Sequence, residues 1–223
     1  MKRIVLVNPN TNAATTALMT SIARAHMAAG FAVDGATAVA GAPLIVDEDQ
    51  LRIAADAVAR MAPSLAGTAD GVIVAAFGDP GVEALGAALS VPVVGIAACA
   101  MGEAAAGGRR FAVVTTTPAL VAAIAARAGS LGLGRQLAGV RITEGPPQAL
   151  MADRQGLVAA LERAARRAIA EDAAEAIIIG GGPLAAAAQA LRNRMPCPVI
   201  EPIPAAVRWM NARLSAESLR EDR

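Results

Sequence analysis

The sequence is poor in aromatic residues, lysine and histidine. Its 223 residues include three Phe, one Trp and no Tyr. This scarcity argues against reading single-stranded nucleic acid by base stacking, and against a sugar cleft lined by aromatic rings. His26 is the only histidine, which excludes a multi-histidine metal site. Lys2 is the only candidate for Schiff-base chemistry. A net charge of +1 gives no excess of positive charge that would indicate binding to a polyanion such as nucleic acid.

Long hydrophobic runs and a cysteine framework are also missing. The apolar run near the N-terminus is about five residues long, shorter than the roughly 7–15 residues in the core of a signal peptide. No uninterrupted apolar stretch reaches the roughly 20 residues of a membrane span. Cys99 and Cys197 are too few and too distant in sequence to predict a disulfide framework. We therefore expect a cytoplasmic protein with no membrane partner.

Short β-branched runs alternate with long Ala-rich segments along the chain. Strands are expected at 3–7, 31–39, 71–76, 91–96, 110–114, 139–142, 176–179 and 197–200, and the longest helices at 11–29, 47–65 and 153–170. The strands are continuously apolar rather than alternating, which indicates burial on both faces. This pattern favours parallel sheets flanked by helices, an α/β fold.

The order of elements repeats halfway along the chain. Val72 follows Ile4 by 68 positions, and Ile177 follows Ala112 by 65. We predict two pseudosymmetric Rossmann-like lobes, each a four-stranded parallel sheet flanked by helices, with the ligand cleft between them. The predicted first lobe covers 1–97 plus about 204–223, and the second covers 98–203.

Matching turns close the equivalent strands of the two halves. The first strand of each half ends in a polar turn, and the third ends in a turn rich in Gly and Pro. Ligands bind at the carboxyl ends of parallel strands, where helix N-termini also point. These turns offer amides, hydroxyls and N–H groups to a carboxylate or a developing enolate, although N-capping is the plainer interpretation. The predicted substrate-binding residues are Asn8, Asn10, Thr11, Phe77, Thr116, Thr117, Gly182 and Pro183.

The glycine-rich turn at 180–182 does not indicate a nucleotide. Neither a G-x-G-x-x-G nor a G-x-x-x-x-G-K-[ST] pattern is present, and no lysine follows. A close approach of the backbone to a small ligand explains the glycines better. We expect a small-molecule substrate and no cofactor.

Six motifs extend over nearly the whole chain: V-N-P-N-T at 7–11, A-F-G-D-P-G at 76–81, V-P-V-V-G-I at 91–96, V-V-T-T-T at 113–117, I-I-I-G-G-G-P-L at 177–184 and P-V-I-E-P-I at 198–203. Together they resemble the aspartate/glutamate/hydantoin racemase superfamily, especially its hydantoin and allantoin racemase branch. The resemblance implies a cofactor-independent isomerase that acts on a small carboxylate, amino-acid derivative or hydantoin-type ureide. It also implies a homo-oligomer.

The residues that such a mechanism uses are missing. The usual family mechanism transfers protons at Cα with two cysteines, and the resemblance places these where Ala76 and Gly181 stand. Neither residue ionises, so another acid–base group is needed. Decarboxylation or another lyase reaction of the same superfamily, and ligand binding without catalysis, are therefore alternatives.

Several residues are candidates to replace the two thiols. Asp79 adjoins the first missing cysteine, and Cys99 is expected near a helix N-terminus, where a thiolate is favoured. Against these roles, Asp-Pro-Gly is an ordinary turn, and a lone cysteine is often a small buried hydrophobic residue. The weaker candidates are Glu144, Glu201 and Asp47, whereas His26 and Cys197 are expected to be structural.

Overall fold

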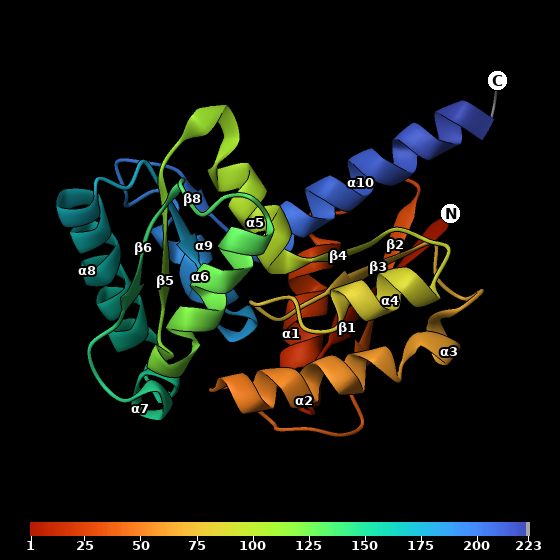
Figure 1. Cartoon of the computed structure of the whole chain (residues 1–223), viewed down its shortest axis with the longest axis horizontal. Coiled ribbons are helices and arrows are strands. Elements are labelled where there is room, and N and C mark those ends of the chain that lie inside the picture. The colour runs from red at the N-terminus through yellow and green to blue at the C-terminus, as the bar shows by residue number, and fades with distance from the viewer. Residues whose placement is uncertain (222–223) are drawn as a thin grey trace. The chain divides into compact units, whose positions relative to one another are not determined.

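The computed structural model describes residues 1–221, and the burial of side chains up to residue 217. Contacts within the chain divide it into two compact units (Figure 1). Unit 1 comprises Met1–Cys99 and Ile203–Arg223, and unit 2 comprises Ala100–Pro202. Helix α5 (Ile96–Ala104) begins in unit 1 and continues into unit 2.

Unit 1 contains one parallel sheet. Its strands are β1 (Lys2–Asn8), β2 (Phe31–Thr37), β3 (Gly71–Val74) and β4 (Val93–Gly95), in the order β2-β1-β3-β4. Its helices are α1 (Ala13–Arg24), α2 (Glu48–Ala59), α3 (Ala62–Leu65), α4 (Val82–Ala88) and the returning α10 (Pro202–Glu221).

Unit 2 repeats this topology. Its strands are β5 (Phe111–Thr115), β6 (Leu137–Ile142), β7 (Ala176–Ile179) and β8 (Val199–Ile200), parallel and in the order β6-β5-β7-β8. Its helices are α6 (Val121–Ser130), α7 (Pro147–Ala152), α8 (Arg154–Asp172) and α9 (Ala185–Leu191), with short 3-10 turns at Ala106–Gly108, Pro118–Leu120 and Gly182–Leu184. The predicted α/β fold with two four-stranded parallel sheets is confirmed.

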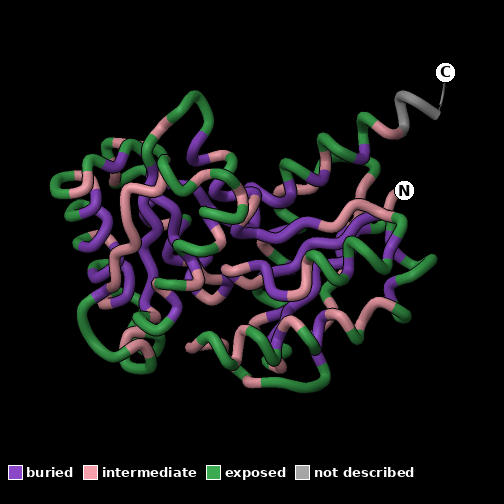
Figure 2. The backbone as a smooth tube through the Cα atoms, in the orientation of Figure 1, coloured by how far each residue is buried: buried purple, intermediate pink, exposed green. Residues whose placement is uncertain are grey.

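The central strands β1, β3, β5 and β7 are largely buried, whereas the edge strands β2 and β6 are mostly half-buried (Figure 2). In unit 1, Val5 and Val72 pack in one cluster with side chains of α2, α3 and α4. On the opposite face, Gly71 makes room for Met210 of α10, because a Cβ at Gly71 would lie 2.6 Å from the Met210 sulfur. In unit 2, one face of β5 and β7 packs against α8 and α9.

Some predicted helix boundaries are wrong, for local reasons. The helix expected at 11–29 begins only at Ala13, because Asn12 is the N-cap and accepts a hydrogen bond from the N–H of Thr15 at 3.1 Å. The helix expected at 47–65 is interrupted between α2 and α3, and α3 carries a proline in its first turn. The short helix α7 was not predicted.

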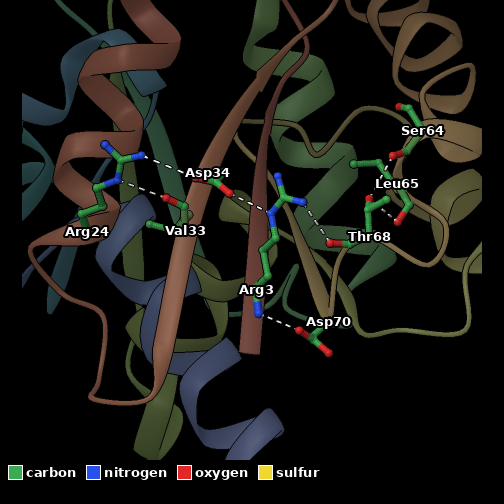
Figure 3. Close-up of polar contacts among 8 residues, drawn as sticks. All are labelled: Arg3, Arg24, Val33, Asp34, Ser64, Leu65, Thr68 and Asp70. Carbon is green, nitrogen blue, oxygen red and sulfur yellow. Dashed lines mark hydrogen bonds and ion pairs between the residues drawn. The ribbon is translucent and has the colours of Figure 1, made fainter. Parts of the chain in front are cut away.

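Charged side chains join the amino ends of the strands in unit 1 (Figure 3). Arg3 Nε lies 2.7 Å from Asp34 Oδ2, and the N–H of Arg3 donates to Asp70 Oδ2 at 2.6 Å. Both members of the Arg3–Asp34 pair are about half exposed, so water screens their attraction. Within the described chain, no helix has the length and apolar character needed to cross a bilayer.

Candidate functional site

The carboxyl ends of the strands correspond residue by residue between the two units. In unit 1, the N–H after β3, from Ala75, donates to the carbonyl of Val7 at 2.8 Å. In unit 2, the N–H after β7, from Gly180, donates to the carbonyl of Val114 at 2.9 Å. A second pair of bonds, each 3.0 Å long, matches in the same way: Ala38 donates to Asn8, and Thr143 donates to Thr115. The equivalent positions are therefore Asn8 and Thr115, Ala38 and Thr143, and Ala76 and Gly181.

In unit 1, asparagine side chains hold the turn after β1 together. Asn8 is completely buried, and its Nδ2 donates to Asn10 Oδ1 at 2.8 Å and to Thr16 Oγ1 at 2.9 Å. Its Oδ1 accepts from the N–H of Asn10 at 3.2 Å. Both ends of the Asn8 amide are thus engaged inside the protein, and the structure gives this residue a scaffolding role.

Asn10 keeps one donor group for another partner. Its Oδ1 accepts from Asn8 Nδ2 and from the N–H of Asn12, the latter at 2.9 Å. Because a backbone N–H can only donate, this contact fixes the orientation of the Asn10 amide. No acceptor for Asn10 Nδ2 is found among the described residues, although the residue is only 6% exposed. The neighbouring Thr11 is half-buried, and its N–H donates to the carbonyl of Ala42 at 3.1 Å.

The turn after β3 contains Ala76, Phe77 and the candidate acid Asp79. Asp79 is 2% exposed. Its Oδ1 accepts from the N–H of Ala97 at 2.7 Å, and its Oδ2 accepts from the N–H of Ala98 at 2.8 Å. Asp79 therefore caps the N-terminus of α5, and both carboxylate oxygens serve this contact.

The two cysteines lie in different surroundings. Cys99 is buried in the first turn of α5, directly after Ala98, and so lies beyond the carboxyl end of β4. Cys197 is partly buried before β8, and burial raises the pKa of its thiol. A raised pKa disfavours the thiolate, which supports the structural role expected for Cys197.

Unit 2 presents hydroxyl groups at the carboxyl ends of β5 and β6. Thr115, Thr116 and Thr143 are each 5% exposed, and Thr117 is half-buried. No hydrogen-bond partner for these four hydroxyls is found among the described residues, and the Thr143 hydroxyl is fully buried. Sequence reasoning missed Thr143. Its signal was a polar residue directly after a strand, as at Thr115.

The turn after β7 contains a glycine, Gly181, in a conformation that favours glycine. Gly181 has a φ of +139°, a conformation that residues with a Cβ rarely adopt. Ala76, the equivalent residue of unit 1, is not among the residues with positive φ. Of the other predicted contacts in these turns, Phe77 and Gly182 are buried and Pro183 is half-buried.

The remaining candidate acids have structural partners. Glu201 is buried and pairs with Arg192, whose Nε lies 2.8 Å from Glu201 Oε1. Glu144 is exposed, 3.4 Å from Arg167. Asp47 caps α2.

His26 also has a structural partner. Its Nδ1 lies 2.9 Å from the carbonyl of Ile22, a backbone contact near the end of α1. Among the described residues, no group of three or more His, Cys, Asp or Glu side chains is arranged to hold a metal ion.

Comparisons with known proteins agree with this geometry. The family model described as Asp/Glu/Hydantoin racemase matches residues 4–210. A hydantoin racemase of Rhizobium meliloti is 31% identical over 96% of this chain and 89% of its own length. The structure of an allantoin racemase from Pseudomonas fluorescens matches with a TM-score of 0.91 and 33% identity, covering 96% of this chain and 92% of that one.

A second allantoin racemase structure, from Klebsiella pneumoniae, gives a TM-score of 0.89 at 32% identity, covering 97% of this chain and 89% of that one. The family match covers almost the whole of both units. The resemblance indicated by the six motifs is therefore confirmed, and the chain belongs to the Asp/Glu/hydantoin racemase family.

Proposed function

We propose that this protein is a cofactor-independent racemase that acts on a hydantoin-type ureide. The observation that carries the proposal is family membership combined with uncharged donors at equivalent strand ends. The relatives named hydantoin racemase and allantoin racemase match along nearly the whole chain. The donors are Asn10 Nδ2 in unit 1 and the hydroxyls of Thr116 and Thr117 in unit 2.

The chemistry of a hydantoin suits such donors. Its C5 carbon lies between a carbonyl carbon and a ring nitrogen, and removal of the C5 proton places negative charge on the carbonyl oxygen. Neutral hydrogen-bond donors aimed at that oxygen stabilise the enolate more than the substrate. Return of a proton to the opposite face of C5 completes racemisation. Each unit is proposed to offer substrate contacts at its own strand ends: Asn10, with Thr11 and Phe77, in unit 1, and Thr116 and Thr117, with Gly182 and Pro183, in unit 2.

The segment between β2 and α2 supports an uncharged substrate. Residues 38–46 are Ala, Val, Gly, Pro, Leu and Ile only, and Val39 is fully exposed. The segment is tied to the Asn8–Thr11 turn through the bond from Thr11 to Ala42. It offers no cationic side chain to a second carboxylate, so it favours a hydantoin with an uncharged substituent over aspartate or glutamate.

The acid–base groups must differ from the two-thiol pair, since Ala76 and Gly181 carry no ionisable side chain. Asp79 already accepts two N–H groups with its two oxygens. Cys99 is therefore the first residue to test as a proton acceptor or donor, and Asp79 the second. The missing thiols also favour a second candidate function, which is decarboxylation of a small carboxylate or binding of a small ligand without catalysis. We further propose that the protein is cytoplasmic and, by family resemblance, a homo-oligomer.

The test uses single enantiomers of 5-benzylhydantoin and allantoin, with EDTA present. Loss of optical rotation and exchange of the C5 proton in deuterium oxide are followed, and spontaneous rates are subtracted. We expect enzyme-dependent exchange and racemisation. Exchange without racemisation would refute the proposal. Carbon dioxide release from a substituted malonate would favour decarboxylation, and binding without exchange would favour a binding protein.

Matched variants locate the site. Asn10→Ala and Thr116→Ala should each reduce kcat/KM by about tenfold or more, the effect of one lost hydrogen bond to a developing charge. Thr68→Ala, at the amino end of the unit 1 strands, is the control and should change it little. Cys99→Ser should slow exchange, whereas Cys197→Ser should not. Full activity in Asn10→Ala and Thr116→Ala would refute the placement of the substrate.

A further inference from the structure

The turn after β3 has an unusual backbone. Gly78, Asp79 and Gly81 have φ values of +119°, +54° and +78°. Glycine adopts such angles easily, whereas a residue with a side chain does so at a cost. Asp79 is one of only two non-glycine residues with positive φ within the described chain. A conformation of this kind persists only where surrounding contacts impose it.

The carboxylate of Asp79 is one of those contacts. It accepts the N–H groups of Ala97 and Ala98, which have no carbonyl partner in the first turn of α5. An N-cap normally comes from the residue that directly precedes a helix. Here it comes from a residue 18 and 19 positions earlier, so the cap fastens a distant turn to the helix.

Packing closes the turn from two sides. A Cβ added to Gly95 would overlap the Asp79 side chain, so Gly95 provides the space that the carboxylate occupies. On the other side, a Cβ at Gly81 would lie 2.8 Å from the Val58 side chain of α2. The turn Ala76–Gly81 is thus clamped between α5 and α2, and we call this arrangement the Asp79 clamp.

We propose that Asp79 is a positioning residue of this protein. Its carboxylate fixes the turn that carries Ala76 and Phe77, and it does so through α5 rather than by touching substrate. The part of this inference that concerns activity rests on the proposed function. The clamp itself rests on the contacts of Asp79 with Ala97 and Ala98.

Hydrogen–deuterium exchange tests the clamp without any substrate. Asp79→Asn keeps the shape of the side chain but replaces one acceptor with a donor, and Asp79→Ala removes both acceptors. Both variants should speed exchange in peptides covering residues 75–81 and 96–100. The control is Asp153→Ala, because Asp153 caps α8 by accepting from Gln155 at 3.1 Å and Gly156 at 3.0 Å. It should speed exchange only at the start of α8.

Kinetics then test the positioning role, at a temperature where circular dichroism shows all variants folded. Asp79→Ala should reduce kcat/KM by about tenfold or more, mainly through KM, and Asp79→Asn by less, whereas Asp153→Ala should stay within about twofold. Equal loss of kcat in Asn and Ala variants, with one limb of the pH profile removed, would make Asp79 an acid–base catalyst and overturn the proposal. Gly95→Ala provides a second route, because it displaces an intact Asp79 and should give the same kinetic pattern.

The two possible failures are distinguishable. Wild-type protein without activity or binding towards either ureide refutes the proposed function, and the exchange experiment still decides the clamp. Unchanged exchange at residues 75–81 in Asp79→Ala refutes the clamp. Faster exchange with unchanged kinetics in an active protein refutes the positioning role.

Discussion

The two units share one topology but end their central strands in different ways. In unit 1, Asn8 is bonded on both sides of its amide and Asp79 caps α5, whereas Asn10 Nδ2 has no acceptor among the described residues. In unit 2, the equivalent edge carries the hydroxyls of Thr115–Thr117 and the glycine turn at Gly181. The same backbone framework therefore supports an edge held mainly by its own side chains in unit 1, and in unit 2 an edge lined by several hydroxyls that have no partner in the described part of the chain.

The helices that follow β4 and β8 show a related difference. The first turn of helix α5 has N–H groups without an intrahelical acceptor, and Asp79 accepts hydrogen bonds from two of them. Helix α10 begins at Pro202 and has a second proline at Pro204, and proline has no N–H to satisfy. Two N–H groups at the start of α5 are satisfied by a distant side chain, whereas two of the first residues of α10 have no N–H at all.

The largest expected contrast is between Asn8 and its equivalent, Thr115. Asn8→Ala should lower the free energy of unfolding by roughly 2–4 kcal/mol, because it leaves several buried polar partners unsatisfied. Thr115→Ala should cost about 1 kcal/mol or less, because its hydroxyl has no partner among the described residues. Urea denaturation of both variants measures the difference. Equal losses of unfolding free energy would show that Asn8 and Thr115 are equally engaged in hydrogen bonds within the protein.

Restoring thiols should reveal a second contrast. Gly181→Cys should cost roughly 1–3 kcal/mol because φ at this position is +139°, whereas Ala76→Cys should be nearly neutral. Thermal unfolding compares the two. A double variant that folds and racemises a hydantoin left unchanged by wild type would support the site while placing the natural chemistry elsewhere. A neutral Gly181→Cys would mean that the turn after β7 adapts easily.

Acid sensitivity should be greater in unit 2. Arg141 bonds Asp172 through two contacts of 2.6 Å, and this hydrogen bonding lowers the pKa of Asp172 below its usual value of 3.8. The stabilisation is therefore complete above about pH 4 and is lost as the pH falls through the lowered pKa of the folded state.

Asp172→Asn should cost about 1 kcal/mol near pH 7 and much less near pH 2. Asp34→Asn, in the half-exposed pair of Figure 3, should cost under about 0.5 kcal/mol at either pH. Urea denaturation of each variant and the wild type at the two pH values measures both losses of stability. An Asp172 effect that does not depend on pH would contradict the assigned cause.

The smallest effect concerns Thr143. Its buried hydroxyl has no partner among the described residues, so Thr143→Val should be neutral or stabilise the protein by up to about 1 kcal/mol. Differential scanning calorimetry detects the shift. A clear destabilisation would show that the hydroxyl bonds to water or another group in the folded protein.

The sequence predicted the sheets better than the site. Continuous apolar runs indicated strands buried on both faces, and β1, β3, β5 and β7 have that burial. The sequence also predicted the turns at the strand ends, because polar residues directly after an apolar strand can be recognised without the structure. The roles within those turns were not visible. Asn8 and Asn10 look alike in sequence, and only their hydrogen bonds show that Asn8 is engaged throughout while Asn10 retains a donor.

The sequence by itself determined the α/β class, the repeat of four strands and the family, because apolar periodicity and short motifs are local properties of the chain. Tertiary structure decided the role of Asp79, since its carboxylate accepts hydrogen bonds from the N–H groups of Ala97 and Ala98, which lie beyond strand β4. It also gave a physical basis to the correspondence of Ala76 with Gly181, which the resemblance had implied and which the hydrogen bonds beside each central strand support. Both depend on contacts between residues far apart in sequence, and such contacts form only when the sheets assemble.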